Sequence, residues 1–189
     1  VDFALTQPAH YIMLTRREGL LSPLASLSET HDGKPVSSLS GTILVRSDRK
    51  DIQNLADLAG KRIATITKTS LASYQAQAYE LLLRGINLTT DATIIEVGQP
   101  QDKVVQQLLD GQVDVAFVRS GLIEAMAREQ KLDIARVRVL NARDDGFPLA
   151  HSTPLYPQWV LAAMPWTDDD FASHLAARIL TIPHGGEVA

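Results

Sequence analysis

Strand-like and helix-like segments alternate at short intervals between residues 61 and 140, and this alternation constrains the fold more than any other feature of the chain. Apolar runs rich in β-branched residues are separated by amphipathic stretches of roughly 10–15 residues. The strand-like runs are residues 62–67, 92–98, 113–118 and 135–140, and the helix-like stretches are residues 71–85, 100–111 and 121–132. Because parallel strands need a crossover of about this length, the pattern predicts an α/β fold whose mostly parallel sheet is covered on both faces.

The segments on either side of this middle part have a different pattern. They predict helices over residues 9–18 and 168–180, a strand over residues 158–164 and a hairpin turn at Asp32-Gly33. We interpret the two flanks as one structural unit that the middle part interrupts. Lobe 1 is then formed by residues 1–45 and 146–189, and lobe 2 by residues 46–145. On this interpretation the chain crosses between the lobes twice, and a cleft lies between them.

Composition excludes several classes of function. The formal net charge of −4, with no Lys/Arg run longer than a pair, argues against nucleic-acid binding. The chain has no cysteine, which excludes disulfides, thiolate catalysis and cysteine-based zinc sites. Its histidines show no metal-ligand spacing, so we predict neither a metal nor a cofactor. No run approaches the roughly 18 apolar residues of a membrane span, and the chain opens directly into a strand-like segment, so we interpret it as a fragment of a longer protein.

The loop "TKTSLAS", residues 67–73, joins a strand to a helix and is rich in hydroxyl groups. Ser70 or Ser73 would be the N-cap, and Thr67 would lie nearby. Backbone N–H groups at the positive end of a helix dipole can hold an oxyanion, and the carboxyl ends of parallel strands are where ligands bind in such sheets. Ordinary helix capping explains the same residues equally well. Both interpretations stay open.

Polar and aromatic residues gather at three further positions. Arg119 and Ser120 end the apolar run "VDVAFV", where an arginine can clamp an anion, although a surface arginine paired with a carboxylate is the simpler alternative. The Pro-bounded stretch 146–159 carries His151, Ser152, Thr153, Tyr156 and Trp159, and it suits either a small-molecule site or a hinge stapled by aromatics. Tyr11, close to the end of the first strand, is a ligand or a core-packing residue.

Several segments carry a family resemblance. Residues 45–65, "VRSDRKDIQNLADLAGKRIAT", and the later "LLLRGI" and "LLDGQVDVAFV" resemble the second lobe of periplasmic solute-binding proteins of the phosphonate/phosphite type. The resemblance implies a periplasmic-binding-protein-like α/β fold of two lobes with a two-segment hinge. The segments "DVAFVRSGLIEAMARE" and "LNARDDGFPLAHSTPLYPQW" are more similar to the branch that forms N-terminal sensor domains of membrane histidine kinases, including tetrathionate-sensing kinases.

Departures from the family pattern alter the expected ligand. Where transport proteins read "STSGY", this chain reads "SLASY", which keeps Ser70 and Tyr74 and loses two hydroxyls at Leu71 and Ala72. Pro100 stands where the transporters carry a histidine, and Asp114 keeps the family's acid. The resemblance therefore implies a small anion other than a phosphonate, such as a sulfur oxyanion. The expected ligand-binding residues are Tyr11, Thr67, Ser70, Ser73, Tyr74, Asp114, Arg119, Ser120, His151, Ser152 and Tyr156.

We therefore expect a non-catalytic, ligand-sensing module on the periplasmic side of an inner-membrane sensor histidine kinase. Its partners would be a small anion and the transmembrane and kinase domains of its own parent. A free solute-binding protein of an ABC transporter for phosphonate- or phosphite-like anions is the alternative. A third hypothesis, from another class, is an enzyme that uses His151 with Asp144 or Asp145 as an acid–base pair.

The resemblance also implies that lobe 1 is incomplete. Members of the family normally carry about 60–70 residues, roughly two βα units, before the segment "VDFAL". Without them, lobe 1 would expose a sheet edge and apolar surface. We expect the edge to be rearranged or covered by a neighbouring chain, which would give a homodimer through lobe 1.

Overall fold

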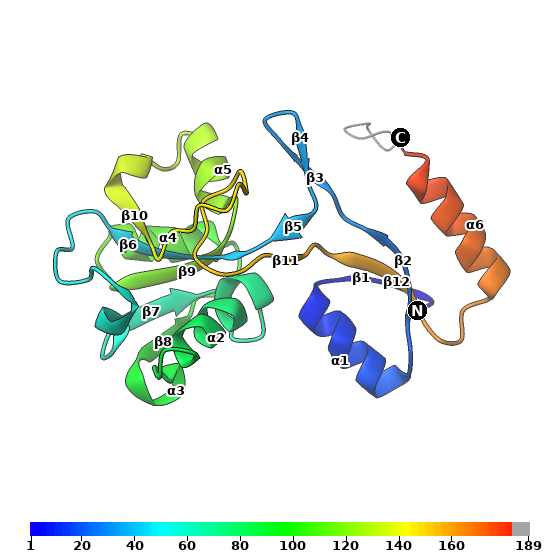
Figure 1. The fold of residues 1–189 in the computed structure, drawn as a ribbon, viewed down its shortest axis with the longest axis horizontal. Coiled ribbons are helices and arrows are strands. Elements are labelled where there is room, and N and C mark those ends of the chain that lie inside the picture. Colours follow the sequence, from blue (N-terminus) through cyan, green and yellow to red (C-terminus); the bar gives the residue numbers. More distant parts are fainter. Residues whose placement is uncertain (183–189) are drawn as a thin grey trace. The chain divides into compact units, whose positions relative to one another are not determined.

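The computed structural model describes residues 1–182, which form two compact units (Figure 1). Unit 1 contains Val1–Leu39 and the residues from Tyr156 to Ile182, and unit 2 is the continuous segment Ser40–Leu155. The chain therefore passes between the units at 39/40 and at 155/156, whereas the sequence predicted crossings at 45/46 and 145/146. Residues 41–45 pair with the sheet of unit 2, and the backbone N–H groups of Ser152 and Thr153 donate to the carbonyl of Gly41.

Unit 2 is built on a five-stranded sheet with the strand order β10-β6-β9-β7-β8. Its strands are β6 (Gly41–Arg46), β7 (Arg62–Thr65), β8 (Thr93–Glu96), β9 (Val115–Arg119) and β10 (Val137–Leu140). The pairs β7·β8 and β7·β9 are parallel, as expected for strands joined by helical crossovers. The pairs β6·β9 and β6·β10 are antiparallel, so the sheet is mixed rather than mostly parallel. The difference comes from β6, which the sequence pattern had assigned to the flanking lobe.

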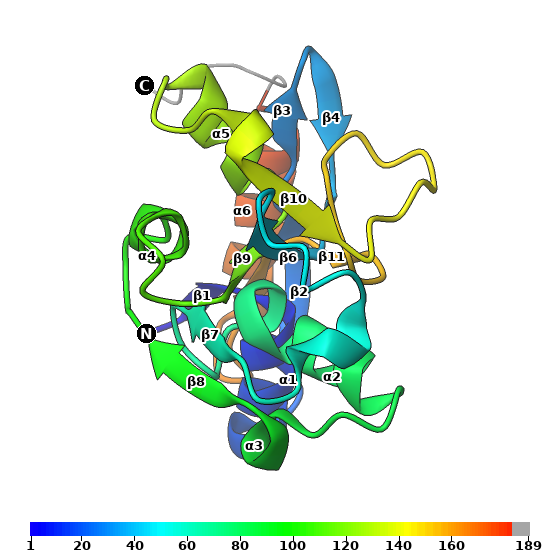
Figure 2. The same ribbon diagram turned by 90° about the vertical axis from the view of Figure 1, so that its left-hand side faces the viewer.

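Helices cover both faces of this sheet (Figure 2). They are the 3₁₀ turn η1 (Leu55–Leu58), the π-helical turn η2 (Leu71–Gln75), α2 (Ala76–Leu82), α3 (Leu88–Asp91), α4 (Asp102–Leu109), α5 (Leu122–Arg128) and the 3₁₀ turn η3 (Ile134–Arg136). Successive side chains of each strand point to opposite faces of the sheet, so the core consists of two clusters, one on each face. Leu44 packs on the α4/α5 face, while Ile43 and Phe117 pack on the face of η1 and α2. Gly85 and Gly111, which the sequence placed at helix ends, have the left-handed φ of 79° and 72°.

Unit 1 is built on a three-stranded antiparallel sheet with the order β1-β12-β2. Its elements are β1 (Phe3–Thr6), α1 (Pro8–Glu18), β2 (Ser22–Ser26), β3 (Glu29–His31), β4 (Lys34–Val36), β5 (Ser38–Leu39), β11 (Tyr156–Pro157), β12 (Val160–Ala163) and α6 (Asp169–Leu180). The predicted Asp-Gly hairpin is confirmed, because β3 pairs with β4 across Asp32 and Gly33 at φ 47° and 75°. Asp168 caps α6 by accepting a hydrogen bond from the N–H of Phe171 at 2.8 Å.

Unit 1 leaves much of its apolar surface exposed. No residue of α1 is buried, and Leu5, Met13 and Phe171 are each more than half exposed. Within residues 1–182, the outer strands β1 and β2 each pair only with β12. A groove of about 400 Å³ lies within this unit, and its apolar lining is Leu5, Ala25, Leu27, Leu161, Ile179, Leu180 and Ile182.

Candidate functional site

The carboxyl ends of β7, β8 and β9 meet at one edge of the sheet in unit 2, because these neighbouring strands are parallel. At this edge Ser73, in η2 after β7, and Arg119, the last residue of β9, share one partner, Gln101. Ser73 Oγ donates to Gln101 Oε1 at 3.3 Å, and the N–H of Arg119 donates to the same oxygen at 3.2 Å. Two of the predicted site residues therefore lie together at the carboxyl edge of unit 2, as the strand order requires.

The hydroxyl-rich loop closes on itself and on the neighbouring strand. Ser70 N–H donates to the carbonyl of Thr67 at 3.2 Å, and Lys68 N–H donates to Glu96 Oε2 at 2.9 Å. The pKa of Glu96 is lowered, first by the Lys68 N–H and then by the Thr67 hydroxyl. Burial, followed by the charge of Glu96, raises the pKa of Tyr74. A carboxylate thus stands at the edge where the sequence predicted only anion-binding groups.

The helix that follows this loop begins with a π-helical turn. Ser70 is the N-cap residue, but its side chain makes no capping hydrogen bond. Its carbonyl accepts from the N–H of Gln75 at 3.0 Å, and the carbonyl of Leu71 accepts from Ala76. The first turn of a helix lacks intrahelical acceptors for its N–H groups, and η2 is the first helical element after β7. The hydroxyl of Ser70 does not perform the capping that the sequence left open.

Ser120 and Ser152 lie in the same unit, but their hydroxyls are bound to the backbone. Ser120 Oγ accepts from the N–H of Ser40 at 3.0 Å. Ser152 Oγ donates to the carbonyl of Leu140 at 2.7 Å and accepts from Ile43 N–H at 2.9 Å. Both serines are buried. They hold the chain beside the first residues of β6, where it enters unit 2.

His151 is only 1% exposed and has a polar partner at each ring nitrogen. Nδ1 lies 2.9 Å from the carbonyl oxygen of Leu149, and Nε2 lies 3.2 Å from Asp145 Oδ2, while Phe147 packs edge-on against the ring. A carbonyl oxygen can only accept, so Nδ1 is the donor in its contact with Leu149. The pKa of Asp145 is lowered, chiefly by its hydrogen bond with His151. The pair considered for acid–base chemistry is thus present, with a buried histidine whose ring nitrogens are both engaged.

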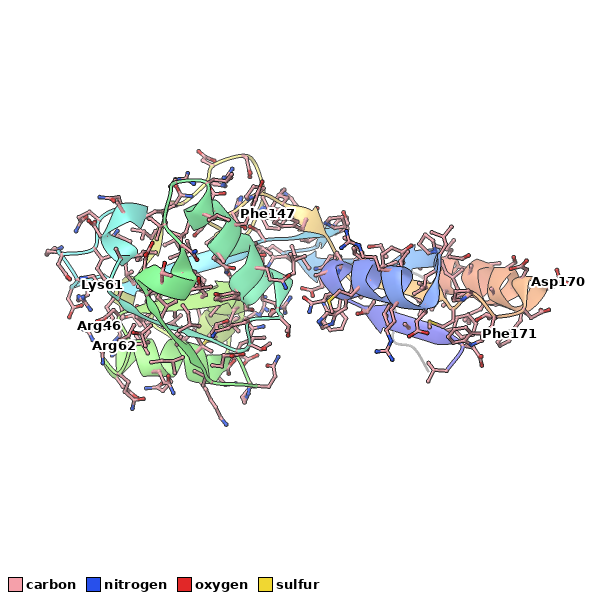
Figure 3. The ribbon with its side chains drawn as sticks, turned by 90° about the horizontal axis from the view of Figure 1, so that it is seen from below. Arg46, Lys61, Arg62, Phe147, Asp170 and Phe171 are labelled. Atoms are coloured by element: carbon pink, nitrogen blue, oxygen red, sulfur yellow. The ribbon has the colours of Figure 1, made fainter. Side chains whose placement is uncertain are left out.

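Asp114 lies at the other end of β9 from Arg119. They are five positions apart along an extended strand, which amounts to roughly 16 Å. Asp114 accepts from Arg49 Nη1 at 2.8 Å and from Arg62 Nε at 3.1 Å. Burial alone would raise the pKa of Asp114, but the hydrogen bonds from Arg62 and Arg49 outweigh it and hold the pKa well below its usual range. Arg62 also donates from Nη2 to the carbonyl of Gly111 at 3.3 Å, and Arg46 lies at the same end of the unit (Figure 3).

Tyr11 and Tyr156 belong to unit 1. Tyr11, on α1, donates its hydroxyl hydrogen to the carbonyl of Leu21 at 2.9 Å. Tyr156 lies in β11, opposite Leu39 of β5. The remaining residues expected to bind ligand all lie in unit 2.

Sequence reasoning missed Gln101, Glu96 and Lys68. Each lies at or just after the carboxyl end of a strand that the pattern had already identified, so its position was a usable signal. The pattern gave no sign that Gln101 would bridge Ser73 and Arg119.

Within residues 1–182, no group of three or more His, Cys, Asp or Glu side chains could hold a metal ion. In the same part of the chain, no helix has the length and apolar character needed to cross a membrane.

Comparison with known proteins identifies the family. Residues 1–188 match the phosphonate-binding family, described as "ABC transporter, phosphonate, periplasmic substrate-binding protein". The chain belongs to this family. It is also 31% identical over 183 residues to the tetrathionate sensor histidine kinase TtrS of Salmonella typhimurium, an alignment that covers 97% of the chain and 31% of that relative. The predicted family is confirmed.

Solved structures share the fold. XAC2383 from Xanthomonas citri bound to ATP matches with a TM-score of 0.73 and 19% identity, covering 96% of this chain and 64% of its own. PhnD1 from Prochlorococcus marinus in complex with methylphosphonate matches with a TM-score of 0.70 and 12% identity, covering 99% and 66%. The predicted periplasmic-binding-protein-like α/β fold is confirmed. The chain spans less than a third of TtrS and about two thirds of these solved relatives.

Proposed function

We propose that this domain is the periplasmic ligand-sensing part of a two-component sensor histidine kinase. The observation that carries the proposal is the 31% identity to TtrS over nearly the whole chain. The parent protein would then supply transmembrane and kinase domains and would lie in the inner membrane. A ligand can drive such a sensor only through its preference for one of the sensor's conformations.

We further propose that the ligand is a small anion that binds at the carboxyl edge of unit 2. Two cationic residues, Lys68 and Arg119, and the first turn of η2 support this assignment. Leu71 and Ala72 in that turn supply no hydroxyls, and the carboxylate of Glu96 repels negative charge from one side of the edge. A compact dianion such as a phosphonate gains less there than a larger anion whose charge is spread over distant oxygens. Tetrathionate and other sulfur oxyanions are therefore the ligands to test first.

Thermal-shift and calorimetric titrations of the 189-residue chain with tetrathionate, thiosulfate, sulfite, phosphite and alkylphosphonates test the ligand class. At about 100 times its Kd, a ligand adds roughly 2.7 kcal/mol of stability, which raises the unfolding midpoint by several degrees. We expect Arg119→Gln and Lys68→Gln to weaken binding and Arg128→Gln, an exposed cation in the last turn of α5, to leave it unchanged. If no oxyanion shifts the midpoint at millimolar concentration, the proposed ligand class is wrong.

A free solute-binding protein of an ABC transporter is the second candidate. The family description and the methylphosphonate complex of PhnD1 favour it. It predicts that alkylphosphonates or phosphite stabilise the chain more than sulfur oxyanions do, so the same titrations discriminate the two candidates.

A homodimer through unit 1 is also a proposal. It rests on the outer strands β1 and β2, each of which pairs only with β12 within the described residues, and on the exposed apolar side chains beside them. Sedimentation equilibrium of the chain is expected to give twice the 20.6 kDa chain mass at micromolar concentration. A monomer over the whole concentration range would contradict the proposal.

A further inference from the structure

The side chain of Gln77 is completely buried beneath the first turn of the helix at the carboxyl edge. Its Nε2 lies 2.8 Å from the carbonyl oxygen of Ala72 and 3.1 Å from that of Val118. A third carbonyl, that of Thr42, is 3.4 Å away. An amide nitrogen has two hydrogens, so it satisfies the two nearer carbonyls. Gln77 thereby ties the helix start to the end of β9, beside the first residues of β6.

The other end of the same amide is unsatisfied. Within residues 1–182, no donor makes a hydrogen bond to the buried Oε1 of Gln77. A buried acceptor without a donor lowers stability, and an apolar side chain of similar volume would avoid that penalty. Stability therefore does not explain a glutamine here. Residues that lower stability locally are typical of positions with a functional role.

The helix turn above Gln77 has the geometry that the amide requires. In the π-helical turn, the carbonyls of Ser70 and Leu71 accept from N–H groups five residues later. The next carbonyl, Ala72, is reached by the Gln77 side chain. Single π-helical turns inside α-helices are frequent at functional sites. The turn also carries Ser73, which is joined through Gln101 to Arg119.

Gly41 provides the space for the Gln77 amide. A Cβ at Gly41 would lie 2.5 Å from both the amide carbon and Nε2 of Gln77. The φ of Gly41 is outside the left-handed region, so its backbone conformation does not require glycine. Gly41 is opposite Arg119 in the β6·β9 register, and its N–H donates to Thr153 Oγ1 at 2.9 Å. A glycine is required here by the fit of one side chain.

We propose that Gln77 is a positioning residue that holds the first turn of η2 in its π-helical geometry against the end of β9. It thereby sets where the N–H groups of that turn and the backbone of Arg119 lie relative to each other. The effect on ligand binding rests on the proposed function of this edge, whereas the effect on the helix turn does not.

The test compares Gln77→Met with Gln75→Met, a matched change on the same helix at a partly exposed position. Amide hydrogen exchange followed by NMR reports the backbone hydrogen bonds of Gln75 and Ala76. Calorimetric titration with tetrathionate reports ligand binding at the carboxyl edge of unit 2. We expect Gln77→Met to keep or raise global stability and to accelerate exchange at those two amides by about tenfold or more. Binding of tetrathionate should weaken by about tenfold, the scale of one misplaced hydrogen bond. Gln75→Met should change neither the exchange rates of these amides nor the affinity for tetrathionate.

A second pair of variants tests whether displacement of the Gln77 amide itself changes the exchange of these two amides. Gly41→Ala should disturb the same two amides because its methyl group displaces the Gln77 amide, and Gly41→Ala combined with Gln77→Ala should be better folded than Gly41→Ala alone. Unchanged exchange at Gln75 and Ala76 in Gln77→Met would overturn the proposal. If the wild-type chain binds no tetrathionate while exchange changes as expected, the positioning role stands and only the ligand assignment fails.

Discussion

The two units of this chain differ in how their apolar residues are used. Unit 2 buries a separate apolar cluster on each face of its sheet, and its loops are held by ion pairs and buried hydroxyls. The largest sheet of unit 1 has three strands, its helix α1 has no buried residue, and several of its apolar side chains are exposed. The contrast indicates that unit 2 carries most of the intrinsic stability and that unit 1 presents surface suited to further contacts.

The largest expected effect comes from the core of unit 2. Phe117 is fully buried in the cluster on the η1/α2 face, and Phe117→Ala should lower the free energy of unfolding by about 3–5 kcal/mol, because it removes apolar contacts and leaves a cavity. Urea denaturation followed by circular dichroism measures the loss. A decrease below about 1 kcal/mol would show that unit 2 is not the stable part of the chain.

Next is the ion-pair cluster at the amino end of β9. Asp114→Asn should cost about 1–3 kcal/mol at pH 7, because Arg49 and Arg62 lose their shared carboxylate. The folded-state pKa of Asp114 lies below its usual range, so this contribution is present above about pH 4 and is lost as the pH falls further. Denaturation of both proteins at pH 7 and pH 3 should show a smaller difference in acid. An equal difference at both pH values would exclude the electrostatic explanation.

Glycine substitutions in the two units test whether the units unfold independently of each other. Gly33 in unit 1 and Gly85 in unit 2 both have a left-handed φ, and a Cβ at either position would contact nothing within 4 Å. Each change to alanine should therefore cost a similar amount, about 1–2 kcal/mol of backbone strain. If the units unfold separately, hydrogen exchange will accelerate only in the unit that carries the substitution. Acceleration throughout the chain in both variants would mean that the units unfold together.

The smallest effect is expected on the surface of unit 1. Phe171 is 58% exposed, and its ring meets Phe3 edge-on with a centroid distance of 5.6 Å. Phe171→Ala should lower stability by less than about 1 kcal/mol in the isolated chain, because only one aromatic pair is lost. A much larger loss at higher protein concentration, measured by thermal unfolding, would show that this face is buried in an assembly.

The sequence predicted the order of helices and strands well, because periods of 2 and 3.6 residues and the C-terminal glycines are local signals. It did not predict that β6 would join the middle sheet. An apolar run such as "TILVR" can pair with any sheet that the chain reaches, so its partner depends on tertiary structure.

The candidate site was predictable only in part. The carboxyl edge with Ser73 and Arg119 follows from the parallel crossovers. The structural role of Ser120 and Ser152 does not follow from the sequence, because their hydroxyls bind backbone groups 80 and 109 residues away in the chain. Asp114 could have been placed from the sequence, because the residue before a strand and the residue at its end lie at opposite edges. The family pattern named this acid as a ligand without saying which edge it occupies.

Unit 2 is one continuous segment, whereas unit 1 is assembled from both ends of the chain, and this arrangement bears on the order of events during folding. Pairing β1 with β12 joins Phe3 to Ala163, a contact that closes a very long loop. Once residues 40–155 have folded, the two ends of this segment lie close together, because the N–H of Gly41 donates to Thr153 Oγ1. The conformational search for unit 1 is then much shorter. On a ribosome, unit 2 is therefore expected to form first, and its completion would bring together the two halves of unit 1.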